Sequence, residues 1–368
     1  MNGFHYISFA QEIIFASGAL AQVPEPAERF GWRRLMLCTS RSVRATGQID
    51  VLATILGDTL VAVFDHVQPH VQDAQVKAAL ALAAENNVDV VMGIGGGSAI
   101  GMAKAVGFQL HLPIIAIPTT YAGSEMTPVY GITHTGEDPP RKVTVNDPKI
   151  APKLVIYDPQ LTLDLPPKLT ASTGINALAH CIEALYSKTC NPLSTSGAIQ
   201  GVQHIHNALF NCYQDGNNLD ARTEMLLGSH LAGLSLASVS MGLHHGLCHV
   251  LGGSANIPHG IANSIILPHA IRFNAEITAP QLLPAAEAMK VPENGISPKG
   301  VIEALARHIQ ELIGMMNLPQ RLRDAGVALK ESDLPHLAQL GFQNRSVQNN
   351  PTPITDASQI ENLLRNAW

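Results

Sequence analysis

The first half of the chain alternates short apolar runs with helical stretches, and this alternation restricts the fold more than any other feature. Apolar runs typical of buried strands occupy Arg34–Thr39, Leu60–Phe64, Val88–Ile94, Pro113–Ile117 and Leu154–Tyr157. Helical patterns lie between some of them, at Asp73–Asn86 and Ala99–Leu110. Strands separated by helices form mostly parallel sheets with helices on both faces. We therefore expect an α/β domain of this kind.

The strand pattern stops after the Pro166-Pro167 pair, and long helical patterns follow. The last strand pattern ends at Asp158-Pro159, a dipeptide that favours a turn. The sequence therefore predicts two domains, an α/β domain over residues 1–158 and an all-α domain over residues 159–368. A chain of 368 residues is long enough to form two separate cores.

The composition excludes several classes of protein. Hydrophobic residues make up 46% and charged residues 14%, which is too apolar for a disordered chain. A net charge of −6 without a long basic run argues against nucleic-acid and membrane partners. No apolar run reaches the roughly 18–20 residues of a membrane-spanning helix, and the N-terminus lacks the pattern of a secretion signal. Five scattered cysteines form no disulfide framework, so we expect a cytoplasmic protein with reduced thiols.

A glycine-rich turn lies where one strand pattern ends and a helix begins. Gly95, Gly96 and Gly97 allow the backbone to approach a ligand closely, and Ser98 follows them. The N–H groups at the start of a helix bind phosphate. For this motif alone the alternative is an ordinary tight turn between strand and helix.

A second loop, rich in hydroxyl groups, follows the next strand pattern and carries Thr119, Thr120 and Ser124. Adjacent carboxyl ends of parallel strands form the ligand crevice of open α/β sheets. The two loops together therefore favour a nucleotide site more strongly than either loop alone.

Histidines are concentrated in the second half. Asn176 and His180 are four residues apart, as are His245 and His249, so each pair shares one face of its helix. His259 follows after a Gly-Gly bend, and the stretches could direct Asn176, His180, His245 and His259 at one point. A single histidine in a helix is usually structural. Independent helices that converge are instead typical of a site.

The motifs GGGS, PTTYAGSE, NALAHCIEALY, HHGLCHVLGG and PHGIANSIILPH together resemble the iron-containing alcohol dehydrogenase superfamily, which includes the dehydroquinate synthase-like enzymes. The resemblance runs to about Asn274. Within the superfamily, TTYAGSEMTP, the Asn of GINALAH and the LHHGLCHVLGGS stretch are most similar to the maleylacetate reductases. Gly246 and the PHGIAN stretch depart from that subfamily, which typically has Lys after the His pair, and are closer to metal-dependent alcohol dehydrogenases.

The resemblance implies a dehydroquinate synthase-like fold, NADH or NADPH as cofactor, and a homodimer. It implies a nucleotide-binding role for the first domain and a catalytic role for the second. By the same resemblance the cofactor would contact Gly95, Gly96, Gly97, Ser98, Thr119, Thr120, Ser124, Lys142, Ser40 and His70. His180, His245 and His259 match the metal-ligand positions, and His249 matches a histidine close to the reacting carbon.

The family's first metal ligand is an aspartate, and this chain has Asn176 there. A neutral amide is a weak ligand for Fe²⁺ or Zn²⁺, although three histidines alone can hold zinc. We therefore expect activity without a bound metal, with imidazoles that polarise the substrate carbonyl. We also expect His245 or His249 to act in the protonated form, so that reduction weakens as the pH rises past the imidazole pKa, near 6.5 unless the site shifts it.

Four functions from different classes are consistent with these residues. The first is NAD(P)H-dependent reduction of a keto acid, maleylacetate to 3-oxoadipate in the degradation of aromatic compounds. The second is a metal-dependent dehydrogenase of a small alcohol or aldehyde. The third, a lyase or cyclase that uses NAD⁺ transiently, would require more Lys and Arg near the site. The fourth is a non-catalytic nucleotide-binding protein, which the retained histidines disfavour.

The residues after the first strand pattern predict the choice between the two cofactors. Many dinucleotide sites have an acid there, which bonds the ribose hydroxyls and rejects a 2′-phosphate. Ser40 takes that place here, and Arg41 follows it. Because Arg can pair with a phosphate, we expect NADPH to be accepted together with NADH.

Overall fold

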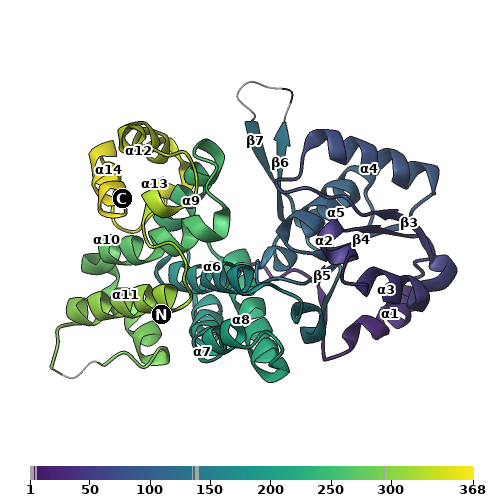
Figure 1. Cartoon of the computed structure of the whole chain (residues 1–368), viewed down its shortest axis with the longest axis horizontal. Helices are drawn as coiled ribbons and strands as arrows, with labels where there is room; N and C mark the ends of the chain where they lie inside the picture. Colours follow the sequence, from purple (N-terminus) through teal and green to yellow (C-terminus); the bar gives the residue numbers. More distant parts are fainter. Residues whose placement is uncertain (1–3, 5, 135, 137–140, 293–294) are drawn as a thin grey trace. The chain divides into compact units, whose positions relative to one another are not determined.

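The computed structural model describes residues 4, 6–134, 136, 141–292 and 295–368, and for residues 141 and 142 the backbone alone. The chain divides into two compact units, each drawn in Figure 1. The first, which we call the sheet unit, comprises residues 7–165 with residues 217–226. The second, the helical unit, comprises residues 166–216 and 227–368 with the described residues before Ile7.

The core of the sheet unit is a six-stranded parallel sheet in the order β1-β8-β5-β4-β2-β3. Its strands are β1 (Glu12–Phe15), β2 (Leu35–Cys38), β3 (Leu60–Phe64), β4 (Val90–Gly95), β5 (Ile114–Pro118) and β8 (Leu154–Tyr157). The five predicted strands are confirmed. β1 was missed because it is four residues long, half-buried at the sheet edge, and begins with a charged residue.

Helices cover both faces of this sheet, as predicted. Leu35 and Leu37 of β2 belong to one core, whereas Met36 and Cys38 belong to the other, because successive side chains point to opposite faces. The first core includes residues of α1 (Pro24–Arg29) and α3 (Gln48–Leu56). The second includes residues of α4 (Asp73–Glu85) and α5 (Gly97–Leu110).

A two-stranded antiparallel hairpin, β6 (Val129–His134) and β7 (Arg141–Asn146), was not predicted. Its strands alternate apolar and polar residues, and Gly131 interrupts the first of them. This pattern is weaker than the continuous apolar runs of the parallel strands.

The helical unit confirms the all-α prediction, since none of its described residues belongs to a strand. Its helices are α6 (Pro167–Tyr186), α7 (Pro192–Gln214), α8 (Leu219–Ser238), α9 (Leu243–Ser254), α10 (His259–Ala288), α11 (Pro298–Met315), α12 (Leu334–Gln343), α13 (Arg345–Gln348) and α14 (Ala357–Asn366). The first residues of α8 belong to the sheet unit. α6 begins at Pro167, where the missing N–H of proline costs no helical hydrogen bond.

None of the described helices alone is long and apolar enough to cross a membrane. Taken together, α8 and α9 have the length and composition of a membrane span, by these two measures only, and the two helices are bent by 97° relative to one another.

Candidate active site

The glycine turn at the end of β4 has the geometry of an anion-binding helix start. Gly95 has φ 138°, which side chains rarely adopt, and a Cβ there would lie 3.0 Å from that of Ala99. Gly96 is the N-cap of α5 and provides no side-chain cap. The first N–H groups of this helix therefore have no side-chain capping oxygen, and N–H groups at such a helix start can bind a phosphate.

The hydroxyl-rich loop after β5 lies against this turn. The Thr119 N–H donates to the Gly95 carbonyl oxygen at 3.0 Å. A Cβ on Gly96 would lie 3.2 Å from Cγ2 of Thr120, a tight contact that a glycine avoids. Ser124 begins the short 3₁₀ turn at the far end of the loop. The structure thus brings the two predicted loops together in the sheet unit.

A cavity of about 500 Å³ opens beside the glycine turn and is lined by residues 40–42, 66–69 and 96–99. It lies at the carboxyl ends of β2, β3 and β4, the usual place of the ligand in open α/β sheets. A larger hollow of about 680 Å³ lies at the amino ends of β5 and β8, lined by Trp32 and Lys153 among others. No predicted site residue lines that larger cavity. The smaller cavity, which is lined by predicted cofactor residues, is therefore the better candidate for the nucleotide site.

None of the described residues that line this cavity is acidic. Ser40 is the N-cap of α2 (Arg41–Arg44), and its Oγ accepts the Val43 N–H at 3.4 Å. Asp65, which follows β3, forms a 2.5 Å ion pair with Arg44. A 2′-phosphate in this cavity would therefore face hydroxyls and Arg41 rather than an unneutralised carboxylate.

Two predicted cofactor residues are not among the residues that line the cavity beside the glycine turn. His70 is exposed, has φ 62°, and is not among the residues that line the cavity. Lys142 pairs with Thr133 in the β6–β7 hairpin, but its side chain lies outside the described part of the structure. Their cofactor roles stay predictions.

The predicted histidines gather in the helical unit at α6, α9 and the start of α10. The rings of His180 and His245 stack with centroids 4.6 Å apart. The ring centroids of His259 and His245 are 6.2 Å apart, and the ring of His249 stacks on that of His259 with centroids 5.6 Å apart. His180 and His245 are buried, as is Asn176 one turn before His180, whereas His249 and His259 are exposed. The rings form a row that leads from the interior to the surface.

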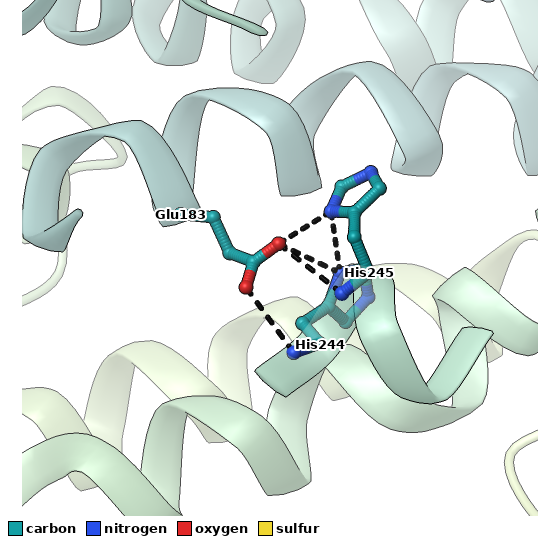
Figure 2. Close-up of side chains that lie close together, drawn as sticks. All are labelled: Glu183, His244 and His245. Carbon is teal, nitrogen blue, oxygen red and sulfur yellow. Dashed lines mark hydrogen bonds and ion pairs between the residues drawn. The ribbon is translucent and has the colours of Figure 1, made fainter. Parts of the chain in front are cut away.

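A buried carboxylate that the sequence analysis missed organises this row. Glu183 of α6 approaches the first turn of α9, as Figure 2 shows. Its Oε1 accepts the N–H groups of Gly242 and His244 at 3.0 and 3.1 Å. Its Oε2 accepts the N–H and the Nδ1–H of His245 at 3.2 and 2.5 Å. Glu183 therefore caps α9, whose N-cap Gly242 has no side chain to do so.

Glu183 could have been found from its spacing. It follows His180 by three residues, so both lie on one face of α6. An acid within the apolar stretch CIEALY is rarely buried unless it is paired.

The bond to Glu183 determines which nitrogen of His245 carries the proton. Because Nδ1 donates, Nε2 of the neutral ring presents a lone pair. Nε2 of His245 and Nδ1 of His180 are buried and have no hydrogen-bond partner within the described residues. Buried polar atoms of this kind mark a place where a polar group of a ligand can bind.

Burial, more than the opposing bond to Glu183, lowers the pKa of His245, and burial lowers the pKa of His180 still further. The pKa of His245 therefore lies below the usual imidazole value near 6.5. For Glu183, burial raises the pKa, but hydrogen bonds with His244 and His245 outweigh it and leave the pKa well below its usual range.

The donor set lacks the carboxylate that the family's metal ligands include. Among the described residues, one group brings three ligand atoms within 4.8 Å of one another: Glu183, His244 and His245. Glu183 already accepts four N–H donors, so its oxygens are not available to a cation. At the family's ligand positions Asn176 supplies an amide, which offsets none of a cation's charge.

Known proteins resemble this chain over nearly its whole length. The Fe-containing alcohol dehydrogenase C-terminal model matches residues 170–368, and the iron-containing alcohol dehydrogenase model matches residues 10–159. A maleylacetate reductase of Pseudomonas knackmussii is 36% identical, with 97% of this chain and 95% of that protein covered. The crystal structure of maleylacetate reductase from Agrobacterium tumefaciens is 33% identical, with a TM-score of 0.89 and coverage of 100% and 99%. Sulfoacetaldehyde reductase from Bifidobacterium kashiwanohense, solved with NAD⁺, is 25% identical, with a TM-score of 0.90 and coverage of 100% and 99%.

A glycine turn at the carboxyl end of a parallel sheet, together with a histidine row on helices, defines a nicotinamide-dependent oxidoreductase that acts on a small molecule. The chain belongs to the iron-containing alcohol dehydrogenase family.

Proposed function

We propose that this enzyme reduces maleylacetate to 3-oxoadipate with NADH or NADPH. Maleylacetate reductases that match nearly the full chain support the proposal. The observation that carries it is Asn176 beside His180. An aspartate at this position would repel the carboxylates of a keto acid dianion. The amide is neutral and can donate a hydrogen bond to a substrate oxygen.

The residues present can manage the proton that this reduction requires. Maleylacetate and 3-oxoadipate both contain the ketone, so the bond that is reduced is the carbon–carbon double bond conjugated to it. The dihydronicotinamide, when bound, supplies a hydride to the alkene carbon β to the ketone, and the ketone becomes an enolate. The free Nε2 of His245 is the position from which an imidazolium stabilises the enolate oxygen and supplies its proton, and the enol then returns to the ketone with a new C–H bond. Glu183 stabilises that imidazolium through Nδ1–H, as a carboxylate does in acid–base dyads.

The substrate itself favours the protonated ring. Two substrate carboxylates near an imidazole raise its pKa, because an opposite charge favours the cation. Binding of the dianion therefore opposes the effect of burial on His245. The exposed His249 and His259 lie at the open end of the row, where a carboxylate can meet them.

The chain's own residues hold the cofactor in this proposal. The N-terminus of α5 at Gly96–Ser98 binds the pyrophosphate, and the cavity beside Ser40 and Arg41 receives the adenosine ribose. The described residues that line the cavity include no acid to repel a 2′-phosphate, so both cofactors are used. We further propose a homodimer, from the family resemblance, and light scattering during size-exclusion chromatography measures it.

The second candidate is a metal-dependent dehydrogenase of a simple alcohol or aldehyde. The buried lone pair on Nε2 of His245 favours it, because a neutral imidazole whose other nitrogen donates to a carboxylate is also the usual metal ligand.

One experiment separates the two candidates. Oxidation of NADH and NADPH is followed with maleylacetate and with simple aldehydes, before and after EDTA treatment, together with metal analysis. We expect turnover of maleylacetate that survives chelation. Activity on aldehydes alone, lost with EDTA and restored by Fe²⁺ or Zn²⁺, would establish the alternative.

A further inference from the structure

Lys104 is a buried cation that no step described above uses. It lies in α5, about two turns after Gly97, and is 0% exposed. Burying a charged group is costly unless hydrogen bonds compensate it. The cost of burying Lys104 must therefore be offset by the groups to which its ammonium is bonded.

The ammonium of Lys104 is bonded to one stretch of the hydroxyl-rich loop. Nζ donates to the carbonyl oxygens of Ser124, Thr127 and Val129 at 2.5, 2.7 and 3.0 Å. The Oγ1 of Thr127 lies 3.1 Å from the same Nζ and itself donates to the Ser124 carbonyl at 3.0 Å. An ammonium has three N–H donors, so the three carbonyl oxygens account for all the donors of Lys104.

Other buried groups fix the same stretch from a different side. Glu125 is 0% exposed, and its Oε1 accepts the hydroxyl of Tyr157 in β8 at 2.9 Å. The Glu125 carbonyl accepts Nε2 of Gln11 at 3.1 Å. The loop is thus tied to α5, to β8 and to the segment before β1, which are all parts of the sheet unit.

The opposite end of the loop contacts the glycine turn that is predicted to bind phosphate. Thr119 is bonded to the Gly95 carbonyl, and Thr120 lies against Gly96. The loop therefore runs from the start of α5 to a point about two turns along the same helix. A displacement at Ser124–Val129 would be transmitted to the threonines that face the glycine turn.

We propose that Lys104 is a positioning residue for dinucleotide binding: its ammonium clamps the loop at Ser124, Thr127 and Val129 and so holds Thr119 and Thr120 against the phosphate-binding turn. The inference rests on the proposed cofactor site. It assigns Lys104 no contact with substrate or cofactor.

Lys104→Met tests the clamp, because Met is similar in length but has no donor. Lys77→Met is the matched control, since Lys77 is an exposed lysine of α4 in the same unit. We expect the Kd of NADH, measured by fluorescence titration, to rise at least about tenfold in Lys104→Met and to stay unchanged in Lys77→Met. At saturating NADH, kcat should fall by no more than about threefold, because the chemical groups are intact.

A milder variant keeps the test decisive if Lys104→Met does not fold. Thr127→Val preserves the shape of the side chain but removes the hydroxyl that Lys104 and Ser124 share. We expect a rise of about two- to fivefold in the Kd of NADH, the effect of losing one hydrogen bond. Hydrogen exchange at residues 119–129 should be faster in both variants than in the wild type.

The outcomes separate this inference from the proposed function. A wild type that binds neither NADH nor NADPH refutes the function. A wild type that binds NADH, together with folded Lys104→Met and Thr127→Val proteins of unchanged affinity and exchange, refutes the clamp and leaves the function standing. Equal losses of kcat and affinity in step with thermal unfolding would make Lys104 a structural residue only.

Discussion

Glu183 and His245 are joined by a 2.5 Å hydrogen bond between helices α6 and α9, with Nδ1 of the histidine as donor. The same carboxylate accepts three backbone N–H groups at the start of α9. One side chain therefore both starts the helix that carries His245 and sets the tautomer of its ring. Orientation of the proposed proton donor and local stability are coupled through this bond.

Glu183→Gln should lower kcat/KM for maleylacetate by roughly 10- to 100-fold, the usual effect of removing a carboxylate that orients a histidine. In either orientation of the amide, its NH₂ group faces N–H donors, so stability should also fall by about 1–3 kcal/mol. Steady-state kinetics and thermal unfolding measure both effects. Glu287→Gln, at an exposed site in α10, serves as the control and should change neither.

Asn176→Asp should create a metal site that the wild type lacks. The new carboxylate would offset a cation's charge beside His180 and His245. We expect bound Fe²⁺ or Zn²⁺ by elemental analysis and activity that now depends on metal. Wild-type protein that already carries one metal per chain, and loses activity on chelation, would contradict the metal-free mechanism.

Ser40→Asp should convert the enzyme to strong NADH preference. Asp caps a helix as well as Ser does, so α2 should still form. Its charge would repel the 2′-phosphate, and we expect kcat/KM with NADPH to fall by at least about 100-fold, or 2.7 kcal/mol. Ser40→Asn keeps the cap without the charge and should retain NADPH use. A wild type that already favours NADH by that factor would refute the proposed tolerance.

Two glycines of α9 should respond to alanine with opposite signs. A Cβ on Gly246 would lie 2.5 Å from Cγ2 and 2.9 Å from the backbone N of Val347, whereas Gly253 has nothing within 4 Å. Gly246→Ala should cost about 1–3 kcal/mol by overpacking and reduce activity through its neighbour His245. Gly253→Ala should raise stability by about 0.5–1 kcal/mol, because glycine disfavours helices. Urea unfolding distinguishes the two, and equal behaviour would count against the described packing of α9 on α13.

Stability should decrease as the pH falls, in two stages. The pKa of His180 is lowered well below 6.5, chiefly by burial, so the unfolded chain binds the proton first and stability is lost below about pH 6.5. The pKa of Glu183 is lowered below 4.5, because hydrogen bonds to His244 and His245 outweigh burial, so its contribution is present above about pH 4.5 and is lost below it. Thermal unfolding from pH 8 to about pH 2 measures both stages. In Glu183→Gln the second stage should be smaller, and an unchanged second stage would assign it to other carboxyls.

Much of the fold could be read from local patterns. Continuous apolar runs predicted β2, β3, β4, β5 and β8 because strands buried on both faces contain little else. The short edge strand β1 and the β6–β7 hairpin escaped because their residues are half-buried or alternate with polar ones. Spacing identified Asn176 and His180 as neighbours on one helix face, but could not show that His180 is buried and His249 exposed.

The sequence by itself determined the parallel sheet, the glycine turn at its carboxyl end and the helical faces that carry the histidines. Each follows from a local pattern: a continuous apolar run, a glycine-rich stretch, or a helical period of about 3.6 residues. Only the tertiary structure decided which nitrogen of His245 is free and what Lys104 holds. The first depends on a contact between residues 62 positions apart, and the second on carbonyl oxygens at least 20 positions from the lysine. Burial and main-chain hydrogen bonding across such separations arise from packing, which no local pattern encodes.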